Sequence, residues 1–406
     1  MLRHTASEVD TSFAGPPRRG GLMPLLLPLL ALLLSLVALA VDSAHLWQAR
    51  QELQSCADAA ALAAVQGLVH DGLLCPAPGR MAELVAAARG HAQHLARLNP
   101  SAGHPLELQA NELQDPLGDI VFGFFEPATG QFLPARTEEI DWPMLNAVRV
   151  MARRSQERGN AVPLFFGAWI RRAGADVAGE ALAILDRDIV GLRAVPRTTI
   201  PMMPLALLSD PAAKEELSWE VQIEQHLCLP HRELPRMLVH LPLDADEGDK
   251  SNGFWLRLGT AELAGWVRQI HFGLSATDLQ AWDGALVPPE NGTLSVPAEP
   301  FLPASSRAEL RDLHQALLTL SLSEQPRIWP LYAQVGKGED GGLAVGLSRF
   351  VAAKLEALEL HLSERRLTLV LRPCQIVTTT ALARSQAEPA DSFTPNPYIA
   401  KARLVK

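Results

Sequence analysis

The sequence predicts an α+β protein in which an N-terminal transmembrane helix continues as an alanine-rich helix that packs on an antiparallel β-sheet. A second mixed α+β region is expected to follow. Three observations lead to this prediction: an apolar run near the N-terminus, an alanine-rich helical period directly after it, and a later change to two-residue alternation. The chain has 406 residues, of which 48% are hydrophobic and 20% charged, so it can bury a sizeable core.

The charge balance argues against nucleic acid as a partner. The formal net charge is −9, whereas nucleic-acid-binding proteins usually present a basic face. The largest local basic clusters are the pairs Arg171–Arg172 and Arg365–Arg366, which are too small to follow a phosphate backbone.

The apolar run Leu22–Val41 has the length of a membrane span. It holds about twenty residues with Ser35 as its polar side chain, which matches a hydrocarbon core of roughly 30 Å. A cleaved signal peptide is the alternative, because Ala38 and Ala40 have the A-x-A spacing of a cleavage site. The run is longer than the usual apolar region of about 7–15 residues in such peptides, and the helical pattern continues through the cut site. We therefore expect a retained transmembrane helix at residues 21–41.

Flanking charges give the expected orientation. Arg18 and Arg19 precede the run and Asp42 follows it, so the positive-inside rule places residues 1–20 in the cytoplasm and the rest across the membrane. Residues 1–20 are rich in Gly, Pro, Ser and Thr, and we expect a disordered tail there.

The helix after the anchor carries a seam of mostly small side chains. No Gly or Pro interrupts residues 41–66, and the helical period continues to residue 67. Small seam residues allow a close approach of a neighbouring helix or sheet. The pattern leaves open whether the seam packs on its own domain alone or also on other subunits. The helix-packing seam consists of Leu46, Leu53, Ala57, Ala60, Ala64 and Gly67.

The stretch "VDSAHLWQARQELQSCADAAALAA" resembles the signature of the TadE/TadG-like family of the tight-adherence (Flp) pilus machinery. In that family an acidic residue, an R-x-x-L-Q segment and a D-A-A-A-L-A run follow the anchor. Asp42, Arg50, Leu53, Gln54 and Asp58 stand at the matching positions here. Later segments such as "NAVRVMARR", "PLFFGAW" and "DVAGEALAI" are similar to the long, TadG-like members.

One departure from true type IV prepilins concerns processing. Those proteins are cut after a Gly, with a Glu five residues into the apolar helix. Here Gly21 is followed by Leu, Met, Pro, Leu and Leu, with no carboxylate inside the run. The departure argues against a major-pilin role and favours an uncut anchor.

The resemblance implies a membrane-anchored, non-enzymatic component of a Flp pilus assembly system, minor-pilin-like or accessory. It implies the lipid bilayer and other Tad pilus proteins as partners, and a single-pass protein of the bacterial inner membrane with a periplasmic or extracellular C-terminal region. No cofactor, nucleic acid or small-molecule substrate is expected. The alternative is an anchored periplasmic hydrolase or metal-dependent enzyme without a recognisable local motif.

Periodicity divides the remainder into domains. Residues 42–192 should form the helices and the antiparallel, pilin-like sheet, with strands in "DIVFGFFE", "QFLPA", "NAVRVMARR", "VPLFFGAWI" and "DVAGEALAIL". A proline-rich stretch near residues 192–201 predicts a boundary, after which residues 193–384 should form a second α+β domain. There "SRFVAAKLEALEL" fits either helix or strand, and alternation together with the family resemblance favours strand. Residues 385–406 are polar and irregular, and we expect a flexible tail.

No residue presents itself as catalytic or as a metal ligand. The sequence lacks the common nucleophile, phosphate-loop and zinc-peptidase motifs. The acidic loop 244–249 departs from the EF-hand pattern, and His226, Cys228 and His231 would need a distant fourth ligand. Of the four cysteines, Cys228 and Cys374 both follow the expected boundary in apolar surroundings. We predict a disulfide between them, although Cys56 and Cys75 also offer partners.

Overall fold

The structure is a computed structural model. It describes residues 23–75, 79–140, 144–210, 215–227, 234–243, 251–290, 292–301, 307–338, 341–361, 366–384 and 395–405. The expected disordered tail at residues 1–20, the acidic loop at 244–249 and Cys228 lie outside these residues.

The chain divides into two compact units. One comprises Met1–Ala49 and Arg154–Val177, and the other comprises Arg50–Arg153 and Ala178–Lys406. This division differs from the expected one, which separated residues 42–192 from residues 193–384. The difference has a physical reason: strands from both expected domains share one β-sheet in the second unit.

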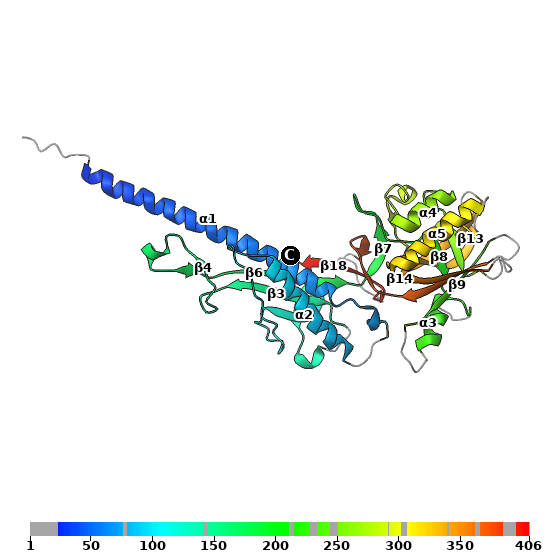
Figure 1. The fold of residues 1–406 in the computed structure, drawn as a ribbon, viewed down its shortest axis with the longest axis horizontal. Helices are drawn as coiled ribbons and strands as arrows, with labels where there is room; N and C mark the ends of the chain where they lie inside the picture. The colour runs from blue at the N-terminus through cyan, green and yellow to red at the C-terminus, as the bar shows by residue number, and fades with distance from the viewer. Residues whose placement is uncertain are drawn as a thin grey trace, which may run out of the picture. The chain divides into compact units, whose positions relative to one another are not determined.

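The first unit contains the N-terminal part of a long helix and a short hairpin (Figure 1). Helix α1 (Met23–Gln66) runs without interruption through Pro28 and continues into the second unit. Strands β4 (Val162–Pro163) and β5 (Gly174–Ala175) pair antiparallel, and the 3-10 helix η3 (Gly167–Ile170) forms the tip between them. The strand expected in "VPLFFGAWI" is therefore wrong beyond Pro163, where the chain turns.

The first sheet of the second unit has six strands. The pairs β1–β2, β1–β3 and β6–β18 are antiparallel, and the short pair β16–β18 is parallel. The second half of α1 and helix α2 (Arg80–Leu98) lie along this sheet in Figure 1. Across the sheet, the strands follow the order β16 (Ile376–Val377), β18 (Ile399–Val405), β6 (Val177–Asp186), β3 (Ala147–Arg154), β1 (Ile120–Glu126) and β2 (Gln131–Pro134).

The flexible tail expected at residues 385–406 is wrong for residues 399–405. They form β18, whose residues Lys401 to Val405 pair with Asp186 to Leu182 of β6. The side chain of Ile399 is fully buried at the start of this strand. Residues 385–394 lie outside the described part of the chain.

The second sheet has seven strands and contributes to a hydrophobic core of this unit. Helices α4 (Leu263–Phe272) and α5 (Arg307–Ser323) pack with this sheet, and α3 (Trp219–Leu227) lies by β9. Strand β13 pairs parallel with β8 and antiparallel with β14. The order is β12 (Leu294–Glu299), β10 (Gly253–Leu256), β8 (Leu205–Leu208), β13 (Arg327–Lys337), β14 (Leu343–His361), β15 (Arg366–Pro373) and β9 (Met237–Pro242).

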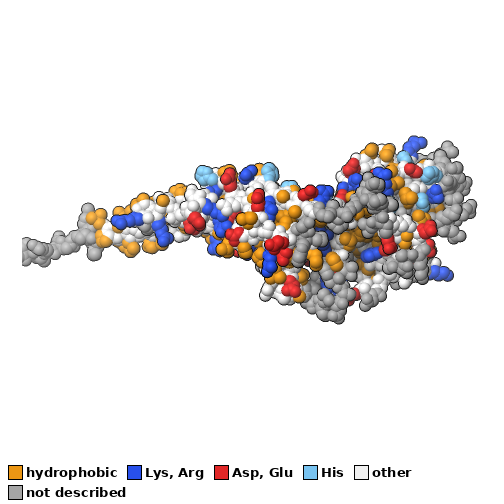
Figure 2. Space-filling model, turned by 90° about the horizontal axis from the view of Figure 1, so that it is seen from below, with side chains coloured by type: hydrophobic (Ala, Val, Ile, Leu, Met, Phe, Trp, Pro, Cys, Tyr) orange, Lys and Arg blue, Asp and Glu red, His pale blue; other side chains and the backbone are white. Residues whose placement is uncertain are grey.

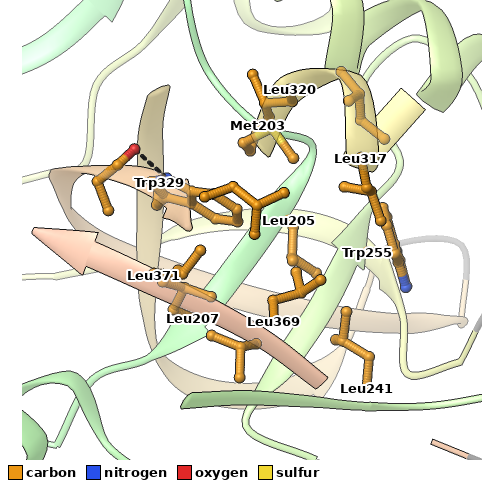
Figure 3. Packing of buried hydrophobic residues seen from close by; sticks show 14 of the residues in the cluster. Met203, Leu205, Leu207, Leu241, Trp255, Leu317, Leu320, Trp329, Leu369 and Leu371 are labelled. Atoms are coloured by element: carbon orange, nitrogen blue, oxygen red, sulfur yellow. Dashed lines mark hydrogen bonds between the residues drawn. The ribbon is translucent and has the colours of Figure 1, made fainter. Parts of the chain in front are cut away.

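Figure 3 shows how this core is filled. Side chains from β8, β13 and β15 meet those of α5, and the Trp329 indole N–H donates to the Ala353 carbonyl at 3.1 Å. That bond satisfies the one polar atom of a fully buried ring, and buried indole N–H groups usually find such a partner. A smaller sheet joins β11 (Ala285–Leu286), β7 (Ile189–Arg193) and β17 (Ala381–Ala383). The described residues also form the 3-10 helices η1 (Asp71–Leu73), η2 (Thr137–Glu139) and η5 (Gln280–Trp282).

Helices precede the first sheet along the chain, and mixed helices and sheets follow. The α+β class predicted from the sequence is confirmed.

Candidate membrane anchor and helix-docking site

The N-terminal half of α1 exposes apolar side chains on every side. Within residues 26–39 the leucines are about half to two-thirds exposed, with Leu27 at 70% and Leu39 at 65%. The Ser35 hydroxyl donates to the Ala31 carbonyl one turn earlier at 2.8 Å, so the one polar side chain of the run is satisfied within the helix. Among the described residues, one helix is long and apolar enough to cross a membrane, and it is α1 over Leu26–Gln66.

Asp42, directly after the apolar run, is the first buried charged residue of α1. Its side chain is 8% exposed, although it lies between leucine-rich and glutamine-rich segments of an exposed helix. Its carboxylate accepts the backbone N–H of Phe165 at 2.8 Å and that of Phe166 at 3.2 Å. Both amides belong to the tip of the β4–β5 hairpin, which has no strand partner for them there. The acidic residue after the anchor therefore fixes a distant loop to the helix within the first unit.

Further along α1 the seam is closed inside the second unit. Leu53, Ala57, Ala60 and Ala64 have no exposed surface. Because these four side chains are fully covered by their own chain, they are not available to another subunit in this structure. Leu46, which belongs to the first unit, is half-buried.

Helix α2 covers part of this seam at close range. A Cβ placed on Gly67 would lie 3.0 Å from the Cα and Cβ atoms of Ala88, so a glycine at the end of α1 lets the helices approach. The buried Cys56 thiol lies 3.7 Å from the Ala96 carbonyl oxygen. Small side chains on both helices make this distance attainable.

The β6 strand contacts the same helix through main-chain atoms. Gln54 uses both ends of its amide: its Nε2 donates to the Glu180 carbonyl at 2.7 Å, and its Oε1 accepts the Glu180 N–H at 3.3 Å. A Cβ on the neighbouring Gly179 would lie 2.6 Å from the Gln54 nitrogen and 2.7 Å from the Leu53 carbonyl carbon. The helix backbone therefore rests directly on a glycine of β6.

Two more acidic residues of α1 hold local contacts. Asp58 accepts the Nε2–H of Gln54 at 2.9 Å, which orients that amide towards β6. Glu52 accepts the backbone N–H of Ala102, in the loop after α2, at 2.7 Å. Asp42, Leu53, Gln54 and Asp58, which carry the family resemblance, thus act as docking residues that attach one helix to the rest of the chain.

Sequence reasoning did not identify Gly179 or the hairpin tip as parts of this arrangement. A glycine inside an otherwise alternating strand, as in "DVAGEALAI", is the available signal for a close backbone approach. The sequence predicts a strand at Phe165 and Phe166, and their acceptor Asp42 lies 123 and 124 positions away along the chain, where no local pattern points to it.

The predicted Cys228–Cys374 disulfide stays a prediction, because Cys228 lies outside the described residues. Cys374 is fully buried, and burial raises the pKa of its thiol to about 12. Among the residues that the structure describes, no three His, Cys, Asp or Glu side chains gather closely enough to hold a metal ion.

An exposed apolar helix that is long enough to cross a membrane and continues into a docked helix indicates a membrane-anchored protein. Residues 20–67 match the family model described as Flp pilus-assembly TadE/G-like, which confirms the predicted family for this segment. Comparison with curated proteins and with solved structures finds no match.

Proposed function

We propose that this protein is a non-enzymatic component of a Flp pilus assembly system, minor-pilin-like or accessory, and that it is closest to the long TadG-like members of the family. Its partners would be the lipid bilayer and other Tad pilus proteins. In this proposal the anchor lies in the bacterial inner membrane, and residues 42–406 lie on its periplasmic or extracellular side.

The observation that carries the proposal is the use of the TadE/G-like segment in the structure. The match covers residues 20–67, and within it Asp42, Gln54 and the small seam residues attach α1 to the hairpin and to β6. The matched segment thus serves to present a folded region from a membrane helix. An architecture of this kind suits a protein that positions other subunits, a role that requires no catalytic residues.

A localisation experiment tests the proposal. An epitope is inserted in the exposed turn at residues 127–130, between β1 and β2, and the tagged protein is followed in sheared pili and in inner membranes. Recovery in either fraction, together with loss of piliation on deletion, supports a pilus role. Recovery in sheared pili indicates the minor-pilin-like role, and recovery in the inner membrane indicates the accessory role. Normal piliation without the protein would contradict the proposal.

The N-terminus supplies a second test. Because α1 is unbroken and no Glu follows Gly21 at the prepilin position, we expect the mature protein to keep its N-terminal residues. Mass spectrometry of the membrane-extracted chain measures this directly. A new terminus at Leu22 would contradict the uncut N-terminus although the apolar run would remain, and a new terminus near Asp42 would remove the anchor from the proposal.

A further inference from the structure

The tip of the β4–β5 hairpin combines exposed aromatic rings with exposed arginines. The side chains of Phe165 and Trp169 are 68% and 65% exposed. Arg171 and Arg172 follow directly, and both are exposed. Exposing such large apolar rings to water is unfavourable, because covering one ring removes roughly 150–250 Å² of surface from water.

The tip is a defined structure in the described chain. The Arg172 N–H donates to the Gly167 carbonyl at 2.9 Å, and the Trp169 N–H donates to the Phe166 carbonyl at 3.0 Å. A Cβ on Gly167 would lie 2.0 Å from the Arg172 carbonyl oxygen, so this turn requires glycine. The rings of Phe166 and Trp169 meet edge to face at 5.7 Å. Aromatic and basic side chains are thereby held on one short turn.

The first unit places this tip beside the point where α1 leaves its apolar run. The Asp42 carboxylate holds the amides of Phe165 and Phe166, and the Phe165 ring lies 4.9 Å from the ring of His45. Asp42 directly follows the run that ends at Val41. Figure 2 shows hydrophobic and basic side chains side by side over α1 and the hairpin. If the run spans a bilayer, the tip lies at the depth of the lipid headgroups.

We propose that the hairpin tip at residues 164–172 docks on the surface of the bilayer that holds the anchor. Phe165 and Trp169 would sit among the headgroups, where aromatic rings are favoured, and Arg171 and Arg172 would pair with the phosphates of acidic phospholipids. Continuity with the anchor selects lipid over a protein partner, because the apolar span brings these residues to the interface without any second molecule. The inference rests on the anchored orientation of the proposed function.

Site-specific photo-crosslinking of the full chain in lipid nanodiscs tests this contact. A photoreactive phenylalanine analogue replaces Trp169 in one variant, Leu33 of the apolar run in a second, and the exposed Glu157 at the base of the hairpin in a third. We expect lipid adducts at positions 169 and 33 and far fewer at position 157. Adducts at 33 without adducts at 169 would overturn the docking inference and leave the anchor intact.

The remaining outcomes also decide the question. No adduct at position 33 would reject the anchor, and with it both the docking inference and the proposed function. An adduct between position 169 and a second copy of the chain would show a protein interface in place of a lipid contact, and would overturn the inference.

Lipid composition tests the role of the arginines. A basic side chain near an acidic membrane surface strengthens attraction about fivefold. Replacing Arg171→Glu together with Arg172→Glu should therefore lower the lipid adduct yield at 169 at least fivefold in nanodiscs that contain phosphatidylglycerol. The matched Arg171→Lys and Arg172→Lys pair keeps both charges and should retain most of the yield. Equal yields for the two pairs would overturn the charge-pairing part of the inference.

Discussion

Gly179→Ala should separate α1 from β6. The added Cβ would lie 2.6 Å from the Gln54 nitrogen and 2.7 Å from the Leu53 carbonyl carbon, and both are helix backbone atoms that cannot rotate away. Real Cβ contacts begin near 3.0 Å, so helix and strand would have to move apart by several tenths of an ångström. Overpacking of this kind costs about 1–3 kcal/mol. A shift would also lengthen the paired amide contacts of Gln54 with Glu180.

Gly90→Ala is the matched control, because it makes the same chemical change where there is room. Gly90 lies in α2, and apart from its chain neighbours and the backbone of its own helix no atom lies within 4 Å of an added Cβ. Alanine in a helix is favoured over glycine by about 0.5–1 kcal/mol. Thermal unfolding of the full chain in detergent, followed by circular dichroism and protease resistance, measures both variants. We expect a lower melting temperature for Gly179→Ala and an equal or higher one for Gly90→Ala. Equal stability of wild type and Gly179→Ala would refute direct contact between α1 and the glycine of β6.

Three further predictions concern the seam of α1, the hairpin tip and the buried Cys374 thiol. Ala60→Trp should lower expression, protease resistance and piliation, because the Ala60 side chain has no exposed surface and a larger one would overpack the seam, whereas Gln51→Ala at an exposed position should stay within about 0.5 kcal/mol of wild-type stability. Wild-type behaviour of Ala60→Trp would refute the role of the seam as a packing surface. Asp42→Ala leaves two amides of the hairpin tip without their acceptor, at a cost of about 1–3 kcal/mol, so trypsin should cleave the tip faster than in the wild-type protein. Asp42→Asn keeps an acceptor oxygen and should show a smaller increase, and an unchanged cleavage rate in Asp42→Ala would contradict the contact. Burial raises the pKa of the Cys374 thiol from 9.0 to about 12, so between these values the folded state keeps a proton that the unfolded state loses. The reduced protein should therefore lose up to about 1.4 kcal/mol of stability per pH unit between pH 9 and pH 12, and less in Cys374→Ala; the same pH dependence in both proteins would contradict this.

The sequence predicted what depends on local pattern. The apolar run and the alanine-rich helix came from composition and period, and the structure contains both in one unbroken α1. The segment at residues 348–360 fits helix and strand equally by propensity. It forms part of β14, because pairing with β13 on one side and β15 on the other outweighs helix propensity.

Long-range partners account for what the sequence did not reveal. The apolar residues 164–170 have the composition of a strand, yet they form a tip because Gly167 permits a tight turn and Asp42 accepts the amides. Residues 399–405 are mostly apolar, but they follow the polar, proline-containing stretch 385–397, which gives the whole segment the composition of a tail. Their order comes from pairing with β6, far away along the chain. Asp42 and β6 both lie outside the window of about 11–18 residues over which a hydrophobic period can be recognised.

The pairing of β18 with β6 also sets the timing of assembly during synthesis. Strand β6 emerges long before residues 399–405, so until then one side of the six-stranded sheet presents unpaired N–H and C=O groups. Unpaired strands of this kind recruit strands from other chains. The growing chain therefore exposes an unpaired edge of β6 from the synthesis of residues 177–186 until residues 399–405 follow. Truncation before Ile399 would make this transient state permanent.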